Sequence, residues 1–308
     1  MEIRHLDLLR DIARRGTLTA VAAATHRTPS ALSQQLRTAE RELGVKLVEP
    51  ASRGIRLTAA GQLLAEGAED ILQRIARLQA RVEASAGAPR GQVRIGTLPS
   101  AGEVLLPPLM DALAATAIQI DLDDFDIAEE DFAAQTLDAD IVIGHSLTGD
   151  VPTGASGLIS TVLTREPLDI ALPQDHPLAG RLSLSPEDVI GCDWIGVPHR
   201  YPFDSIPVAI EQLTGRSIRR VVRLRDNHLV EALVAQGQGV ALLPRFTTRA
   251  RDGVVLRPLT GVRAERAIVA LSRPDRHARL AVREVTKLLV EIGRDLSETH
   301  AHDRHHRA

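Results

Sequence analysis

The clearest chemical pattern in the sequence lies between positions 28 and 41. Its polar residues recur every three or four positions, and they are Ser30, Ser33, Gln34, Arg37 and Arg41. On a helix these residues share one face, which carries hydroxyl, amide and guanidinium groups and no acid. A helix fits the major groove of DNA, where Gln pairs with adenine and Arg with guanine or phosphate. Taken alone, such a stripe is more often a solvated helix face.

The surrounding residues predict elements that would hold this stripe against DNA. Periodic apolar residues indicate helices over residues 3–15 and 18–25, separated by Gly16. Thr28 before Pro29 is typical of a helix N-cap, and Gly44 ends the helix that follows. Two short strands at residues 46–48 and 55–57 would form a basic hairpin. This order of helix, turn, helix and wing favours DNA binding over a solvated face.

Different DNA contacts are expected from the helix and from the hairpin. The third helix and its N-cap would contact DNA through five polar residues, Thr28, Ser30, Ser33, Gln34 and Arg37. Gln34 and Arg37 are the candidates for reading bases. Arg53 and Arg56 in the wing would hold phosphates and supply affinity that depends on salt.

A helix of about 27 residues is predicted from Thr58 onward. Its apolar positions follow the 4, 3, 4, 3, 4 spacing of a heptad seam, formed by Leu64, Ala68, Ile71, Ile75, Leu78 and Val82. Such a seam can form a contact between two copies of the chain, or it can pack against the remainder of the same chain. An Ala, Gly and Pro stretch at residues 84–91 follows as a linker, so the helix stands apart and a dimer is favoured.

The rest of the chain alternates strands with helices, which predicts an α/β body with mainly parallel sheets. Strands are expected at residues 92–96, 118–122, 141–143, 168–172, 194–197, 220–224, 240–243 and 267–271. The last helix is expected over residues 276–296. The polar residues 299–308, rich in His, are expected to be a disordered tail.

Several of these stretches resemble one known family. Residues 16–47 contain GTLT, TPSALSQQL and ERELGVKL, and residues 53–61 read RGIRLTAAG. In the body, residues 175–179 read DHPLA and residues 233–244 read LVAQGQGVALLP. Over nearly its whole length the chain is similar to LysR-type transcriptional regulators. It departs from the family pattern at Thr25, Arg27, Ala39, Val48 and Pro50, and Pro50 removes one expected phosphate contact in the wing.

The resemblance implies a fold of three parts. A winged helix-turn-helix would cover residues 1–58, and a linker or dimerisation helix with its hinge residues 59–90. A two-lobed α/β effector domain, like a periplasmic binding protein, would follow. Lobe I would be residues 91–162 with 268–298, and lobe II residues 163–267. The chain would cross between the lobes near residues 161–164 and 266–268.

The resemblance also implies a function and partners. The chain would be a sequence-specific DNA-binding regulator of transcription, modulated by a small molecule bound between the lobes. Its partners would be a double-stranded operator, further copies of itself in a dimer or tetramer, the effector and, for an activator, RNA polymerase. The alternative is a small-molecule-binding module or an enzyme of the same fold with no regulatory DNA binding.

The candidate effector residues come from the carboxyl ends of the predicted strands, where ligands bind in open α/β sheets. They are Thr97, Ser100, His145, Ser146, His199, Asn227 and His228. Ser100 and Asn227 are also expected as helix N-caps, and capping alone would explain both.

The charge distribution differs between the N-terminal DNA-binding part, called the head, and the α/β body, but it does not indicate the charge of the effector. Residues 1–60 carry ten Lys or Arg against six Asp or Glu, whereas residues 91–162 carry one Arg against twelve acids. Only the head is therefore expected to meet a polyanion. The acidic residues 121–131 indicate either a solvated edge or a site for a cation. Arg219, Arg223 and Arg225 would share one strand face and suit an anion equally well.

Other classes of function find no support in the sequence. It contains no Gly-x-Ser-x-Gly, CxxC or HExxH pattern, so no enzyme activity, cofactor or metal is expected. Cys192 is the single cysteine and cannot form an internal disulfide, which suits a reducing cytosol. The charged N-terminus and the lack of an apolar run of 18 residues favour a cytoplasmic protein without a membrane span.

Overall fold

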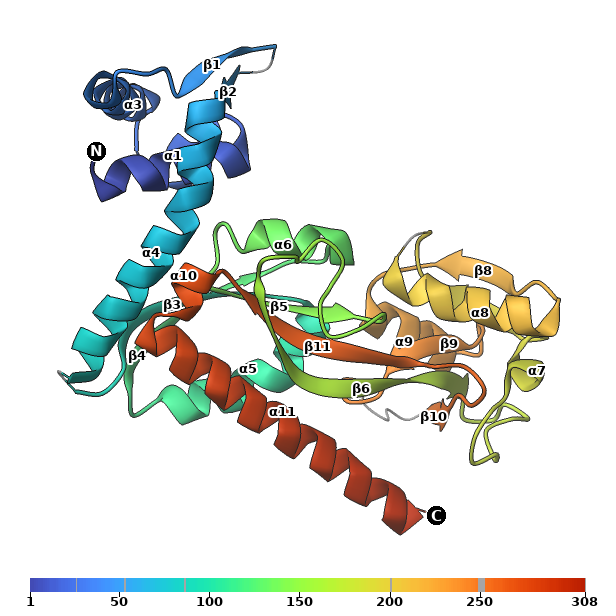
Figure 1. Ribbon diagram of the computed structural model, residues 1–308. Coiled ribbons are helices and arrows are strands. Elements are labelled where there is room, and N and C mark those ends of the chain that lie inside the picture. Colours follow the sequence, from blue (N-terminus) through green and yellow to red (C-terminus); the bar gives the residue numbers. More distant parts are fainter. Residues whose placement is uncertain (26, 53, 86, 200, 249–252, 308) are drawn as a thin grey trace. The chain divides into compact units, whose positions relative to one another are not determined.

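The first part of the chain folds into helices and a hairpin in the predicted order (Figure 1). The elements are α1 (Ile3–Arg15), α2 (Leu18–Ala24), α3 (Pro29–Leu43), β1 (Val48–Ala51), β2 (Gly54–Leu57) and α4 (Ala59–Ser85). The computed structural model describes residues 1–25, 27–52, 54–85, 87–199, 201–248 and 253–307, with side chains as far as His300. The chain divides into a head unit, Met1–Ala88 with Pro274–Leu280, and a body unit formed by the remainder.

Local signals set the helix boundaries in the head unit. The Thr17 hydroxyl accepts a hydrogen bond from the Ala20 amide at 3.1 Å and caps α2. Gly16 and Gly44 end α1 and α3 with φ of 75° and 70°, a left-handed conformation that glycine adopts without steric cost. The predicted helices and the long helix α4 are therefore confirmed.

An apolar core holds the head unit together. Its buried side chains come from α1, α2, α3, α4 and the segment before β1, and they include Leu9, Ile12, Val21, Leu32, Leu36, Leu47 and Ala65. Leu43, which the spacing places on the same face, is instead 37% exposed at the end of α3. A Cβ at Gly61 would overlap the Leu47 carbonyl oxygen, so the approach of α4 to the wing requires glycine.

A segment from the far end of the sequence completes this unit. Helix α10 (Pro274–His277) packs against α4, and the carboxylate of Asp275 accepts a hydrogen bond from Arg10 Nη1 at 2.9 Å. Arg10 is itself buried. The head unit is therefore tied to residues that directly follow the last strand of the body.

The body unit contains the remaining elements. In chain order they are β3 (Arg90–Thr97), α5 (Pro99–Leu113), β4 (Ala117–Asp124), η1 (Glu129–Asp131), α6 (Phe132–Gln135), β5 (Ile141–Ser146), β6 (Ile159–Pro173), α7 (Pro186–Val189), β7 (Asp193–Gly196), η2 (Pro202–Asp204), α8 (Ser205–Thr214), β8 (Arg219–Arg223), α9 (Asn227–Ala235), β9 (Ala241–Pro244), β10 (Val254–Pro258), β11 (Glu265–Ser272) and α11 (Leu280–Arg307).

The main sheet is mixed, and the expectation of mainly parallel sheets is wrong. Seven strands pair in the order β10-β6-β11-β5-β3-β4, with β9 also on β6. Strand β3 pairs in parallel with β4 and β5, but β6 and β11 make only antiparallel pairs. The chain leaves lobe I along β6 and returns along β11, so these two strands must run in opposite directions.

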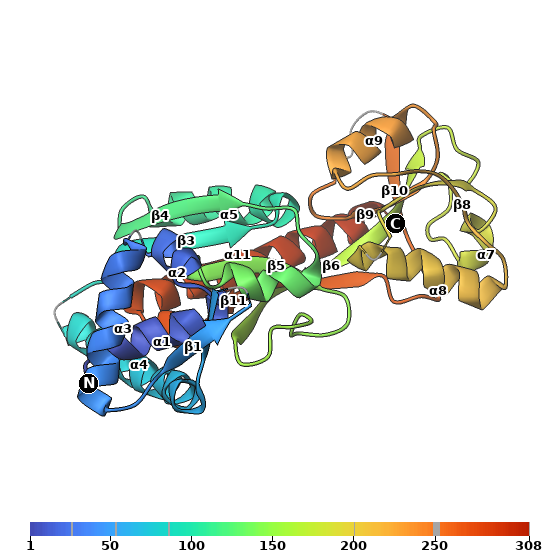
Figure 2. The same ribbon diagram turned by 90° about the horizontal axis from the view of Figure 1, so that it is seen from above.

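Strands β6 and β11 lie side by side in the middle of the body unit, as both views show (Figures 1 and 2). Thr164 pairs with Ile268, and the register shifts between Ile268 and Val269. The predicted crossings at residues 161–164 and 266–268 fall on this paired segment. Strand β6 extends well beyond the predicted residues 168–172, and β10 was not predicted.

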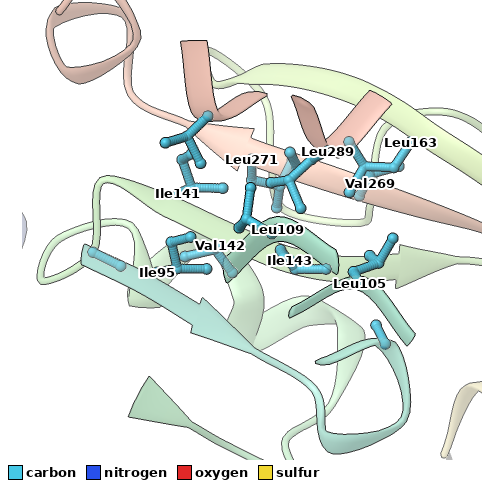
Figure 3. Packing of buried hydrophobic residues seen from close by; sticks show 14 of the residues in the cluster. Ile95, Leu105, Leu109, Ile141, Val142, Ile143, Leu163, Val269, Leu271 and Leu289 are labelled. Carbon is cyan, nitrogen blue, oxygen red and sulfur yellow. The ribbon is translucent and has the colours of Figure 1, made fainter. Parts of the chain in front are cut away.

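Separate hydrophobic clusters support the two ends of this sheet. In lobe I, leucines of α5 and α11 pack on β3, β5 and β11, as Figure 3 shows for Leu105, Leu109 and Leu289. In lobe II, Trp194, Phe203 and Ile210 pack with the second half of β6. Helix α11 continues to Arg307, so the tail expected to be disordered from residue 299 is helical as far as that residue.

Candidate functional site

Helix α3 presents the predicted reading stripe on the exposed surface of the head unit. The Thr28 hydroxyl accepts a hydrogen bond from the Ala31 amide at 3.2 Å and lies 3.1 Å from Ser30 Oγ. Ser30, Gln34, Arg37 and Arg41 are exposed, and Ser33 is partly so. Core residues on the opposite face fix the rotation of the helix, because Leu32 and Leu36 are buried.

The side chains of the stripe are ordered by one another. Arg37 donates from Nη1 to Ser33 Oγ at 2.8 Å and from Nη2 to Gln34 Oε1 at 3.2 Å. Gln34, Arg37 and Arg41 also line a hollow that continues to Lys46. This surface therefore offers guanidinium and amide groups in the chemistry that direct base readout requires.

A buried carboxylate joins the end of α3 to the wing. Glu40 accepts hydrogen bonds from the Leu47 amide at 3.0 Å and from Lys46 Nζ at 2.9 Å. Burial favours the neutral acid, but the hydrogen bonds from Leu47 and Lys46 outweigh it and lower the pKa of Glu40 below its usual value. Glu40 thus fixes where the chain turns from α3 into β1.

The wing supplies an exposed cation. Arg56 on β2 pairs with Glu49 on β1, with 2.7 Å between Nε and Oε1, and both side chains face solvent. A pair in this position is weak and can exchange its partner for a phosphate. Arg53 lies outside the described residues.

The predicted seam on α4 divides between two faces. Ala68 is fully buried and packs with Leu6 and Leu72 inside the head unit, with Leu64 partly buried beside them. Ile71, Leu78 and Val82 are 41%, 60% and 61% exposed, and Ile75 is partly exposed. The first part of the seam therefore serves the head, and the later part forms an apolar stripe on the surface of this chain.

The body unit contains a cavity of about 210 Å³ with walls from both lobes. Four of the seven predicted effector residues line it, namely Ser100, His145, Asn227 and His228. The other three do not. Thr97 and Ser146 are buried elsewhere, and His199 is an exposed loop residue, 4.0 Å from Asp204. We call this cavity the effector pocket.

Neither predicted N-cap has that role. Leu98 occupies the N-cap position of α5, so Ser100 lies in its first turn. The N-cap of α9 is Asp226, whose carboxylate accepts a hydrogen bond from the Leu229 amide at 2.8 Å. Ser100 instead accepts a hydrogen bond from Arg266 Nη1 at 3.1 Å, which orients its hydroxyl.

A buried ion pair supports the floor of the pocket. Arg266 on β11 and Glu166 on β6 are 1% and 0% exposed, with 2.7 Å between Nε and Oε2. The second carboxylate oxygen of Glu166 accepts a hydrogen bond from the Phe246 amide at 2.6 Å. The carboxylate of Glu166 therefore neutralises much of the positive charge that Arg266 would otherwise present to the pocket.

Aromatic side chains from both lobes meet at His145. Its ring lies 5.4 Å from those of Phe132 and Phe203, measured between centroids. Burial, with a smaller contribution from the charge of Arg266, lowers the pKa of His145 to about 3. His145 is therefore neutral at physiological pH.

Two polar contacts connect the lobes across the mouth of the pocket. Tyr201 of lobe II donates a hydrogen bond to Asp126 of lobe I at 3.0 Å, and burial together with Asp126 raises the pKa of Tyr201. His228 of lobe II lies 3.6 Å from the carboxylate of Glu103 in lobe I. The pocket thus lies where a ligand can contact both lobes at once.

Family models match the two parts of the chain that contain these residues. A family model described as a bacterial regulatory helix-turn-helix protein of the lysR family matches residues 3–62. A second, described as the LysR substrate binding domain, matches residues 86–293. The chain belongs to the LysR family of transcriptional regulators. It is a DNA-binding regulator with an effector-binding domain, as the family's two domains require.

Relatives with assigned roles are also regulators. The chain is 28% identical over 277 residues to a hydrogen peroxide-inducible genes activator of Pectobacterium carotovorum, covering 89% of this chain and 91% of that protein. Full-length OxyR from Pseudomonas aeruginosa shares the fold, with a TM-score of 0.66, 18% identity and coverage of 96% and 95%. CbnR complexed with its target DNA also shares it, with a TM-score of 0.52, 20% identity and coverage of 96% and 99%.

Some structural features bear on other functions. No helix among the described residues has both the length and the apolar content that a membrane crossing requires. The same residues hold no group of three or more His, Cys, Asp or Glu placed to bind a metal ion. Cys192 is half-buried away from the effector pocket, and burial raises the pKa of its thiol.

Sequence reasoning missed several residues that line this cavity. They are Glu103, Tyr201, Glu231, Thr247 and Arg266, whereas Asp126 and Arg225 were considered only as parts of opposing charged patches. Glu103 and Glu231 lie one turn beyond Ser100 and Asn227 on the same helices, so helical spacing could have found both. Thr247 and Arg266 come from distant segments, and no local pattern indicates that they meet.

Proposed function

We propose that this LysR-family regulator reads its operator with the N-terminal half of α3 and responds to a small molecule bound in the effector pocket. The observation that carries the second part is a pair of buried polar side chains. Among the described residues, neither ring nitrogen of His145 has a hydrogen-bond partner, and Thr247 Oγ1 also has none. Both side chains line the pocket. Buried polar groups are normally paired, so a ligand that supplies the missing bonds accounts for them.

In the DNA-binding part of the proposal, Gln34 and Arg37 read base edges. Thr28, Ser30 and Ser33 contact the adjoining backbone, and Arg53 and Arg56 hold phosphates. The proposal is supported by the exposure of the stripe and by the hydrogen bonds from Arg37 to Ser33 and Gln34. It accords with the DNA complex of the structural neighbour CbnR.

The exposed part of the α4 seam provides the self-association surface. Ile71, Ile75, Leu78 and Val82 would pair with the same residues of a second copy and bring two heads to two half-sites. A pair of such dimers would make a tetramer. An activator would in addition contact RNA polymerase. A cytoplasmic location is part of the same proposal, supported by the match to a DNA-binding domain.

The effector acts through differential affinity. A ligand that contacts Ser100 of lobe I and Asn227 of lobe II favours one arrangement of the lobes over others. Because the effector domain is joined to the head, that preference changes the affinity for the operator by the same free energy with which DNA changes ligand affinity.

The test combines footprinting with two double variants. The purified chain is footprinted on its own upstream intergenic DNA with a set of small amines, alcohols and carboxylates. Ser100→Ala with Asn227→Ala should keep the footprint without ligand and lose the ligand-dependent change. Ser217→Ala with Gln119→Ala removes two exposed polar side chains outside the pocket and should retain the change. A full ligand response in the Ser100 and Asn227 double variant would place the effector elsewhere.

A further inference from the structure

Carboxylates dominate the charged lining of the effector pocket. Glu103 and Asp126 reach it from lobe I, and Asp226 and Glu231 reach it from lobe II. Two guanidinium groups, those of Arg225 and Arg266, also line it, together with the imidazole of His228, 3.6 Å from Glu103 and 4.0 Å from Glu231. Glu166 already neutralises Arg266 from behind. The electrostatic potential of the pocket therefore favours a positively charged ligand.

The arginines that suggested an anionic ligand are paired away from the pocket. Arg223 binds Asp204 at 3.2 Å and the Val197 carbonyl at 2.7 Å, and the neighbouring Arg220 binds Glu211 at 2.7 Å. Arg219 lies 3.4 Å from Asp193. Only Arg225 of this group reaches the pocket, where its guanidinium lies 6.0 Å from the centre of the Tyr201 ring. Except at Arg225, the strand face that suggested an anionic ligand is therefore engaged with other groups of the protein.

Neutral hydrogen-bonding groups complete the lining. His145 is 1% exposed and Thr247 is 5% exposed, and the described residues offer no partner to the His145 nitrogens or to Thr247 Oγ1. A neutral imidazole has one donor and one acceptor, and a hydroxyl can act as either. These groups would bind a hydroxyl, amide or amine of a ligand without adding charge.

We propose that the effector pocket binds a small organic cation, a protonated amine or guanidine that also carries a hydrogen-bonding group. This proposal rests on the proposed function of the pocket and adds the chemical class of its ligand. A cavity of about 210 Å³ limits that ligand to a small molecule.

The same arrangement explains how a cation would act on the lobes. Glu103 and Asp126 of lobe I and Asp226 and Glu231 of lobe II line one cavity. A cation that binds carboxylates of both lobes would add to the contacts of Tyr201 with Asp126 and of His228 with Glu103. The ligand would therefore shift the population toward the arrangement in which both lobes contact it.

The test uses sets of isosteres on the full-length protein. Each set holds an amine, an alcohol and a carboxylate on the same carbon chain, for example 4-amino-1-butanol, 1,4-butanediol and 4-hydroxybutyrate, with agmatine as a guanidine. Binding is measured by titration calorimetry and by the shift in melting temperature. At least one amine or guanidine should bind ten-fold or more tightly than its isosteres. If no cation is preferred in any set, the proposal is overturned.

Variants locate the binding and keep the test independent of folding. Asp126→Asn and Glu231→Gln should each weaken the binding of the preferred cation at least ten-fold. Asp123→Asn removes an equal charge from the exposed end of β4, outside the pocket, and should leave binding within two-fold. Circular dichroism and the ligand-free footprint identify a variant that fails to fold, and Asp126→Asn, an exposed position, then decides alone.

Two results distinguish a failure of the proposed ligand class from a failure of the proposed effector pocket. Tighter binding of a carboxylate, abolished by Ser100→Ala with Asn227→Ala, would overturn the cation and retain the effector pocket. Cation binding that Asp126→Asn and Glu231→Gln leave unchanged would overturn both the class and its site.

Discussion

Arg266 donates a hydrogen bond from Nη1 to the Oγ of Ser100, 3.1 Å away, while its Nε binds Glu166 at 2.7 Å. Ser100 belongs to lobe I, and Glu166 and Arg266 face each other on the crossing strands. Glu166 also accepts a hydrogen bond from the Phe246 amide in lobe II. One buried ion pair therefore connects a pocket residue of the first lobe with the backbone of the second.

Removing one partner of this ion pair should destabilise the chain strongly. Glu166→Ala leaves the Arg266 charge buried without its carboxylate, and such a loss costs about 3–5 kcal/mol. Urea unfolding should show this decrease, whereas Glu166→Leu with Arg266→Met should recover most of it because both charges are then gone. A decrease below about 1 kcal/mol in Glu166→Ala would show that water reaches the pair.

Base-reading and phosphate-holding residues should differ in how their loss affects DNA binding. Gln34→Ala should reduce discrimination at one operator position by about 1–3 kcal/mol and leave other positions unchanged. Arg56→Ala should weaken binding to all operator sequences alike. It should also reduce the slope of the logarithm of affinity against the logarithm of salt concentration by about one. Fluorescence anisotropy on single-base operator variants at several salt concentrations distinguishes the two effects. Equal losses for both variants on every operator would contradict the assignment.

The two faces of α4 should respond differently to a charge. Ile71 is exposed in the single chain, so Ile71→Asp should fold normally but leave a charge in an apolar dimer contact. Sedimentation should then show a monomer with weaker operator binding. Ala68→Asp places the charge inside the head unit, against Leu6 and Leu72, and should lower the melting temperature instead. An Ile71→Asp protein that sediments like the parent would place the main contact elsewhere.

The stability of the head unit should depend on pH through Glu40. Its pKa is lower in the folded protein than the usual 4.5, so the ionised carboxylate stabilises the fold above that value. This contribution is lost as the pH falls from about 4.5 through the lower folded pKa. Glu40→Gln should be less stable at neutral pH and lose less stability over the acid range. The stability of the head unit can be measured in the full chain by the amide hydrogen exchange of α3 at several pH values. Intrinsic fluorescence cannot report it, because residues 1–88 contain no Tyr or Trp.

Where signals are local, sequence reasoning predicted the structure well. Thr28 with Pro29 and the terminal Gly44 are sufficient to define α3, because capping depends on residues within one turn. The heptad spacing likewise predicted α4. It did not show that Ala68 would be covered by α1 of the same chain, since a small residue suits a close intrachain contact as well as a dimer.

Where the pocket depends on distant segments, prediction was limited by geometry that spacing does not contain. His145 and Ser146 are neighbours on β5, so their side chains point to opposite faces and only His145 enters the pocket. Arg266 follows Glu166 by 100 residues, and their pairing depends on the register of β6 with β11. The N-caps are Leu98 and Asp226, so Ser100 and Asn227 lie in the first turns of their helices. Their side chains line the cavity from there.

The place of β11 in the main sheet sets an order of events during synthesis. It fills the gap between β5 and β6, yet it follows nearly all of lobe II in the chain. A growing chain therefore makes nearly all of lobe II while β5 and the first part of β6 still have open edges, which are prone to pairing with other chains. Lobe I closes only when residues 265–272 have left the ribosome and inserted between strands already made. Until this last insertion takes place, the open edges of β5 and β6 leave a newly made chain prone to aggregation.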